Sequence, residues 1–183
     1  MRFSAGHLSV ALPLVALAAL AGCGKSADDK PKSVDEVMEE AKAMEKPEPG
    51  KYKSSVKVLD FEVPGIPAEQ AAQMKQMMSG VASQSHEFCL KPEDVEKGFE
   101  EMVRKTAEGK CTFDKFDASA NTIDAKMTCE MEQGMASTIA MNGTTTPTKS
   151  VMIMDVEQKA PALPGGAIHM KMEVTNERIG DCS

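Results

Sequence analysis

Sulfur-bearing side chains carry the most distinctive chemistry of this sequence, which has five cysteines and 15 methionines among 183 residues. Four of the cysteines, Cys89, Cys111, Cys129 and Cys182, form an even set, which is typical of disulfides in an exported chain. Cys111 and Cys129 flank a hairpin-like stretch with turn residues at 119–121, so folding the hairpin brings them together. We therefore predict the pairs Cys111–Cys129 and Cys89–Cys182. The alternative, four free or metal-binding thiols, lacks the C-x-x-C spacing typical of zinc sites.

The methionines recur in pairs at strand spacing, as in Met152 and Met154 and again in Met170 and Met172. Three interpretations follow from this pattern. The methionines fill a protein core, for which their flexible side chains are suited. They line an adaptable apolar groove for a lipid-like or peptide ligand. Their thioethers bind Cu(I) or absorb oxidants, in which case these four residues are the candidate metal ligands. Further methionines cluster at Met74, Met77 and Met78, and at Met127 and Met131.

The sequence contains none of the common catalytic motifs: no G-x-S-x-G, no H-E-x-x-H and no phosphate-binding glycine loop. His86 and His169 are the only histidines after the first 22 residues, and His169 falls on the polar face of a predicted strand. No spacing of Ser, Asp and His selects a catalytic triad. We expect no enzyme, no cofactor and no catalytic residue.

The first residues have the features of an export signal. Arg2 is followed by an apolar run over 8–20 that is too short to span a bilayer, and the run ends in Leu20-Ala21-Gly22-Cys23. This ending resembles the lipobox of bacterial lipoproteins, which implies a signal peptide at 1–22 and acyl chains on Cys23. The alternative is an ordinary signal peptide cut nearby, which leaves Cys23 as a plain thiol. Gly24, in place of Asp, resembles lipoproteins sorted to the outer membrane.

Removing residues 1–22 leaves 161 residues with 20 Lys and Arg against 28 Asp and Glu, a net charge of −8. An acidic chain with 4% aromatic residues and no basic patch is an unlikely match for nucleic acid, so we expect none as a partner. It gains no electrostatic attraction to an anionic bilayer, and the acyl chains on Cys23 must therefore hold it there. The other expected partner is an apolar ligand or an envelope protein.

A linker with one short helix is expected over 23–49. Ser33 and Glu36 form a capping box, and apolar residues then recur on one helical face from Val34 to Met44. Prolines at 47 and 49 end the pattern. We expect this helix to dock loosely on its own domain; the alternative is a partner-binding helix near the membrane.

Residues 50–183 are predicted to form a single β-rich domain. The expected fold is mainly β (α+β), a curled antiparallel sheet of six to seven strands with one or two packed helices and two disulfides. Alternating or continuous apolar patterns predict strands over 52–63, 110–117, 122–131, 135–141, 150–157 and 167–175. The strand at 150–157 is apolar on both faces and is expected at the centre, and a parity switch predicts a bulge near Val58-Leu59. Helices are expected over 68–81 and 92–105, with turns at 64–65, 142–147 and 161–166.

Several landmarks occur in a fixed order: Pro49-Gly50-Lys51-Tyr52, Val63-Pro64-Gly65-Ile66-Pro67, Cys89-Leu90-Lys91-Pro92, Asn121-Thr122-Ile123 and Arg178-Ile179-Gly180-Asp181-Cys182. Together they resemble a bacterial envelope family known as domain of unknown function 3617. The resemblance covers about 49–182 and implies an exported, mostly β domain with these cysteines. It implies no activity. The first motif of the family usually carries Trp where this chain has Tyr52.

These observations combine into one expectation about function. We expect a lipid-anchored protein of the cell envelope, held in the outer membrane and facing the periplasm, with a non-enzymatic structural or binding role. The alternative is methionine-based buffering of periplasmic copper or oxidants.

Overall fold

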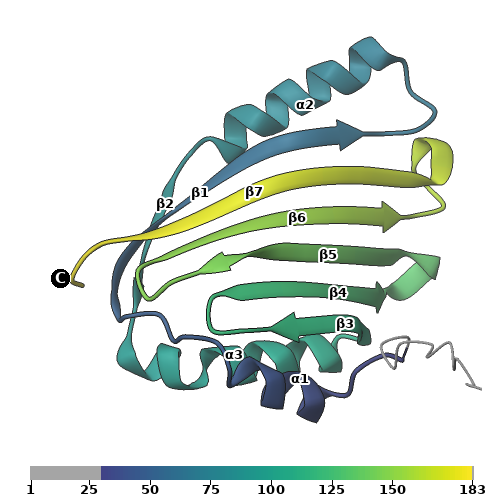
Figure 1. Ribbon diagram of the computed structural model, residues 1–183. Helices are drawn as coiled ribbons and strands as arrows, with labels where there is room; N and C mark the ends of the chain where they lie inside the picture. The colour runs from purple at the N-terminus through teal and green to yellow at the C-terminus, as the bar shows by residue number, and fades with distance from the viewer. Residues whose placement is uncertain (1–29, 183) are drawn as a thin grey trace, which may run out of the picture.

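The computed structural model describes residues 30–182, in which seven strands form one antiparallel sheet with three α-helices packed at its two ends (Figure 1). The helices are α1 (Val34–Ala41), α2 (Ala68–Ala82) and α3 (Pro92–Glu108). The strands are β1 (Gly50–Glu62), β2 (His86–Leu90), β3 (Cys111–Ala118), β4 (Thr122–Glu130), β5 (Ala136–Thr145), β6 (Lys149–Lys159) and β7 (Ala167–Gly180). The predicted mainly β fold with two disulfides is confirmed. The predicted signal peptide and Cys23 lie outside the described residues.

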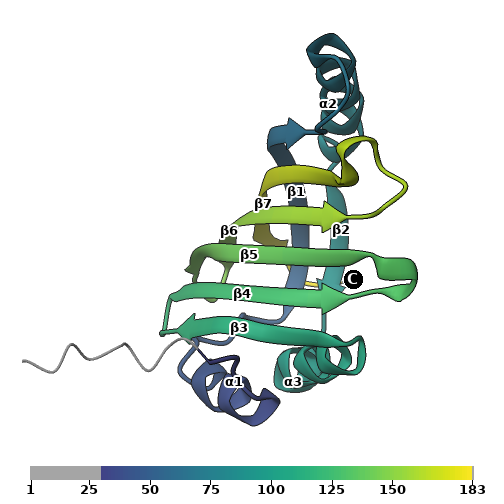
Figure 2. The ribbon, with the colours of Figure 1, turned by 90° about the vertical axis from the view of Figure 1, so that its right-hand side faces the viewer.

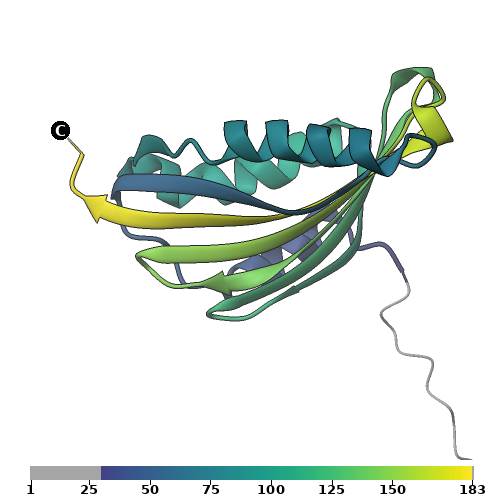
Figure 3. The same cartoon turned by 90° about the horizontal axis from the view of Figure 1, so that it is seen from above.

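The sheet has the order β2-β1-β7-β6-β5-β4-β3 and curves without closing into a barrel (Figure 3). Strand β6 is the fourth of seven, which confirms its predicted central place. The register of β1 against β7 shifts between Val58 and Asp60, so the predicted bulge is also confirmed. A bulge of this kind leaves one residue, here Leu59, without a partner in the ladder.

One face of the sheet is lined with apolar side chains across five strands. Cross-strand partners lie on the same face, and one such row runs from β4 to β1 through Ala125, Met141, Met154, Met172 and Val58. Polar partners such as Asp155 and Lys171 occupy the opposite face. The alternation predicted for 122–131 and 167–175 is therefore present in β4 and β7.

The buried core lies at the β3 end of this apolar face. Val37 of α1 and Val103 of α3 pack with Phe113 and Phe116 of β3. Figure 2 shows α1 and α3 together beyond β3, with α2 at the opposite end of the sheet. Helix α2 buries no residue at all. The largest buried cluster therefore lies at the β3 end, whereas at the β1 end Phe61 and Val63 are buried but α2 adds no buried residue.

Helix α1 is firmly docked on the domain. Its Val37 is 0% exposed, and the predicted capping box is present, with Ser33 and Glu36 exchanging hydrogen bonds at the helix start. Docking on its own domain was the expected arrangement, but the helix belongs to the core rather than lying loosely on it.

Both predicted disulfides are confirmed. Cys111–Cys129 joins the ends of the β3–β4 hairpin, and Cys89–Cys182 joins β2 to the C-terminal segment. Lys51 of β1 pairs with Cys89 on one side and with Gly180 on the other. The second disulfide therefore links the two strands that flank the start of β1.

Three details differ from the sequence-based expectations. Strand β2 was not predicted. Asn142 and Gly143 lie inside β5 rather than in a turn, since Gly143 pairs with Met152 at a position where a Cβ atom would come within 2.1 Å of the Val151 carbonyl oxygen. The helical spacing predicts one apolar face on α2, made of Ala71, Met74, Met78 and Val81, but the helix contributes no buried residue, and Val81 at its end is 68% exposed.

Candidate functional site

A methionine-lined cleft separates α2 from the sheet. Its volume is about 380 Å³, and eight apolar residues line it. They come from β1, α2 and β7: Val56 and Val58; Met77, Met78, Val81 and Ala82; and Met170 and Met172. This volume falls in the range of about 300–1,000 Å³ that is usual for small-molecule sites.

The floor of the cleft follows from strand alternation. Met170 and Met172 are two residues apart on β7 and so share a face. Their neighbours on β1 are Phe61, opposite Met170, and Val58, opposite Met172. The bulge at Leu59 lets both Val58 and Phe61, three residues apart, fall on this apolar face.

The wall of the cleft is one face of α2. Met77, Met78, Val81 and Ala82 are spaced so that they lie together on a helix. Lys75 fixes the helix to the bulge, because its Nζ donates a hydrogen bond of 2.9 Å to the Leu59 carbonyl oxygen. The same amine lies 3.5 Å from Asp60 Oδ1. The Phe61 backbone N–H and then Lys75 lower the pKa of Asp60 below its usual value.

The cleft is open to solvent. Met77 is 71% exposed and Val81 is 68% exposed, although both line it. Large apolar side chains this exposed, gathered at one place, are typical of a binding surface.

The four methionines proposed from the sequence as possible metal ligands do not all meet. Met170 and Met172 line the cleft. Met154 lies beside Met172 in the β6–β7 register but does not line the cleft, and Met152 packs against the core cluster at the other end of the apolar face. The two methionines that join Met170 and Met172 are instead Met77 and Met78 of α2. The sequence showed both groups, but only the sheet order, which puts β7 next to β1 and its helix, brings them together.

His169 makes a polar contact with the neighbouring strand. His169 Nε2 lies 2.6 Å from Asp155 Oδ1 on the polar face of the sheet. The cross-strand partners of these two residues are Glu157 and Lys171, so the contact belongs to a network of surface charges. Within residues 30–182, no group of three His, Cys, Asp or Glu side chains is placed to hold a metal ion.

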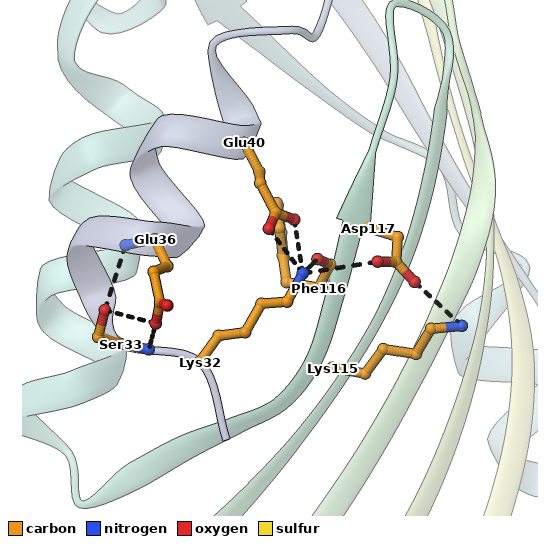
Figure 4. Close-up of polar contacts among 7 residues, drawn as sticks. All are labelled: Lys32, Ser33, Glu36, Glu40, Lys115, Phe116 and Asp117. Atoms are coloured by element: carbon orange, nitrogen blue, oxygen red, sulfur yellow. Dashed lines mark hydrogen bonds and ion pairs between the residues drawn. The ribbon is translucent and has the colours of Figure 1, made fainter. Parts of the chain in front are cut away.

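The N-terminal segment joins the domain at the β3 edge, through Lys32 (Figure 4). Its backbone N–H donates a 2.7 Å hydrogen bond to the Phe113 carbonyl oxygen. Its Nζ pairs with Glu40 at 2.7 Å and Asp117 at 3.5 Å, and also donates to the Phe116 carbonyl oxygen. The hydrogen bond to Glu40 is the main reason that the pKa of Lys32 is raised. Lys32 thus ties the chain to the edge strand and to α1 at once.

The sequence landmarks around Pro49, Cys89 and Arg178 meet at one corner of the sheet. Arg178 Nε donates a 3.0 Å hydrogen bond to the Pro49 carbonyl oxygen. Gly50 has φ +152°, and a Cβ atom there would lie 2.5 Å from Arg178 Nε and 2.6 Å from the Gly180 carbonyl oxygen. The Cys89–Cys182 disulfide closes the same corner. These landmarks therefore serve the fold, since together they join β1, β2 and β7.

Among the described residues, no helix combines the length and the apolar character needed to cross a membrane. Neither the curated proteins nor the solved structures include a match to this chain. One family model, described as "Protein of unknown function (DUF3617)", matches residues 47–182. The match begins just before β1 and ends at the last disulfide cysteine, so it spans the whole sheet with α2 and α3. The chain therefore belongs to the DUF3617 family.

Proposed function

We propose that this protein is an exported, lipid-anchored protein of the cell envelope, and that its cleft between α2 and the sheet binds an apolar ligand. The role is that of a binding module, with no chemical step. The anchor is an acylated Cys23, and the domain faces the periplasm from the outer membrane.

The sulfur chemistry of the chain supports export. All four cysteines in the described residues are paired in disulfides, and stable disulfides are typical of oxidising compartments. The Leu20-Ala21-Gly22-Cys23 sequence supports an anchor, because two or more acyl chains hold a protein to a bilayer where one is marginal.

The cleft itself is the observation that carries the binding role. All eight of its lining residues are apolar, so a ligand gains from burying hydrocarbon and finds no charged group to pair with. Methionine side chains adapt to the shape of what they contact. These features suit one unbranched hydrocarbon chain better than a rigid, polar molecule.

The position of the cleft supports binding while the protein is anchored. The chain enters the domain at β3, and the cleft lies at β1 and β7, on the far side of β4, β5 and β6 in the sheet order. An anchor attached through the β3 edge therefore leaves the cleft uncovered.

The binding role is tested with N-phenyl-1-naphthylamine, an apolar dye that fluoresces when it is buried. We expect saturable binding by the full chain, weakened by about tenfold in the double variant Met77→Ser/Val81→Ser, because each change removes apolar contact from an exposed wall. Met102→Ser on α3 is the control, since Met102 is also exposed, at 52%, but lies away from the cleft. Non-saturable binding by the parent, or equal loss in the control, refutes the role.

The anchor is tested separately by Cys23→Ser. We expect the variant to leave the membrane fraction and to lose acyl labelling in whole cells. A variant that still takes up label and still sediments with membranes would show that Cys23 is not the anchor.

A further inference from the structure

We propose that the four methionine sulfurs of the cleft, those of Met77, Met78, Met170 and Met172, form a binding site for Cu(I). The inference concerns the same cleft but goes beyond hydrocarbon binding, because it uses the sulfur lone pairs rather than the apolar surface of these side chains.

The structure brings two pairs of methionine residues to one cleft. Met77 and Met78 are adjacent on α2, and Met170 and Met172 share one face of β7, and all four line the same cleft. Each side chain has three rotatable bonds and an unbranched end, so its sulfur can move without moving the backbone. Because the helical pair and the strand pair lie on separate elements, the sulfurs approach an ion from different sides.

The chemistry of the lining selects a soft cation. Thioethers are soft, neutral ligands that favour Cu(I), whereas Zn²⁺, Mg²⁺ and Ca²⁺ require imidazole, thiolate or oxygen ligands. No His, Cys, Asp or Glu lines the cleft. Cu(II), which prefers nitrogen and oxygen ligands in a tetragonal arrangement, is disfavoured for the same reason.

Within residues 30–182, the disulfides leave methionine as the available sulfur ligand. Thiolates bind Cu(I) well, but the cysteines of the described residues are bonded to one another and lie outside the cleft. The single positive charge of Cu(I) is also compatible with the molecule as a whole, since the net charge of the chain is −7 and its field attracts cations.

The test is anaerobic Cu(I) titration of the full-length protein in detergent, in competition with the chromogenic chelator bicinchoninate. We expect one Cu(I) per chain, and an affinity lowered by about 100-fold or more in the variant Met77→Leu/Met78→Leu/Met170→Leu/Met172→Leu, because leucine keeps the volume and removes the sulfur. Met152→Leu/Met154→Leu is the matched control, since neither of these methionines lines the cleft, and we expect it to bind like the parent. X-ray absorption at the copper edge should show sulfur as the only neighbour.

The outcomes separate this inference from the hydrocarbon site. The fourfold leucine variant should still bind the naphthylamine dye, because the cleft stays apolar. If that variant fails to fold, Met77→Leu/Met78→Leu alone serves, since both changes lie on a helix with no buried residue. The inference is overturned if the parent does not compete with bicinchoninate, if the leucine variants bind Cu(I) as the parent does, or if the Met152/Met154 control loses binding equally. Loss of dye binding with Cu(I) binding intact would instead overturn only the hydrocarbon site.

Discussion

Replacing Val37 by alanine tests whether α1 is part of the domain. The Val37 side chain is 0% exposed and packs in the cluster with Val103, Phe113 and Phe116. The change removes two methyl groups, worth about 0.8 kcal/mol each in transfer free energy, and the cavity left behind adds to the loss. We expect the free energy of unfolding to fall by about 2–3 kcal/mol, which lowers the Tm of a domain of this size by about 5–10 °C.

The assay is urea unfolding followed by circular dichroism, with Val81→Ala as the control. Val81 lies on α2 and is 68% exposed, so the same chemical change there should cost less than about 0.5 kcal/mol. Both sites are helical, and the helix propensity that alanine adds, about half a kcal/mol, therefore acts in the same direction in both variants. If the two variants differ by less than about 0.5 kcal/mol, α1 does not unfold with the rest of the domain and the reasoning fails.

Further predictions concern the disulfides, one glycine and the loss of stability at low pH. Replacing Cys89 and Cys182 by alanine should lower the free energy of unfolding by about 4–5 kcal/mol, and removing the Cys111–Cys129 disulfide should lower it by about 3 kcal/mol, because the closed loops span 93 and 18 residues. Urea midpoints measured under non-reducing conditions check this order. Gly143→Ala should destabilise by about 2 kcal/mol or more in thermal melts, whereas Gly80→Ala, where a Cβ meets nothing within 4 Å, should be neutral or stabilising. The pKa of Glu36 is lowered from 4.5, mainly by the Ser33 backbone N–H at the helix start. The contribution of Glu36 to the free energy of unfolding is therefore present above pH 4.5 and is lost as the pH falls below it. Urea midpoints measured from pH 6 to pH 3 should fall less steeply in Glu36→Gln than in the parent.

The strands with a two-residue period were predictable from sequence because one buried face forces alternation. Residues 122–131 and 167–175 show it clearly, and β4 and β7 form there. The hairpin disulfide followed from the same reasoning, because Cys111 and Cys129 turn out to be direct partners in the β3–β4 register. Local signals were sufficient wherever the partner strand was close in sequence.

The features that the sequence did not predict depend on contacts between residues far apart in the chain. Strand β2 has only five residues and pairs with only the first five of β1, so neither its length nor its pattern marks it. Asn142-Gly143 is a strong local turn signal, but the two residues pair across β5 and β6, where Gly143 leaves room for Met152. Tertiary packing overrode the local preference.

Only part of the candidate site could be predicted from the sequence, for a similar reason. Met170 and Met172 could be placed on one strand face, and Met77 and Met78 on one helix. Their meeting depends on β1 and β7 lying side by side, two strands that are more than 100 residues apart in the chain. The spacing of apolar residues along the chain does not indicate that β1 and β7 are neighbours in the sheet.

The docking of α1 has a consequence for how far the domain can extend from the anchor that we propose on Cys23. With Lys32 bound to β3, the anchor proposed on Cys23 lies nine residues before this contact, which limits the distance between the two to about 30 Å. If Lys32 and α1 detach from the domain, the distance is limited instead by the 27 residues from Gly24 to Gly50, which span about 90 Å when fully extended. This distance cannot increase further unless β1 is disrupted, because the start of β1 pairs with β2 and β7, which the Cys89–Cys182 disulfide links. With the proposed anchor on Cys23, the docking of this one helix therefore sets the maximum distance between the domain and the membrane.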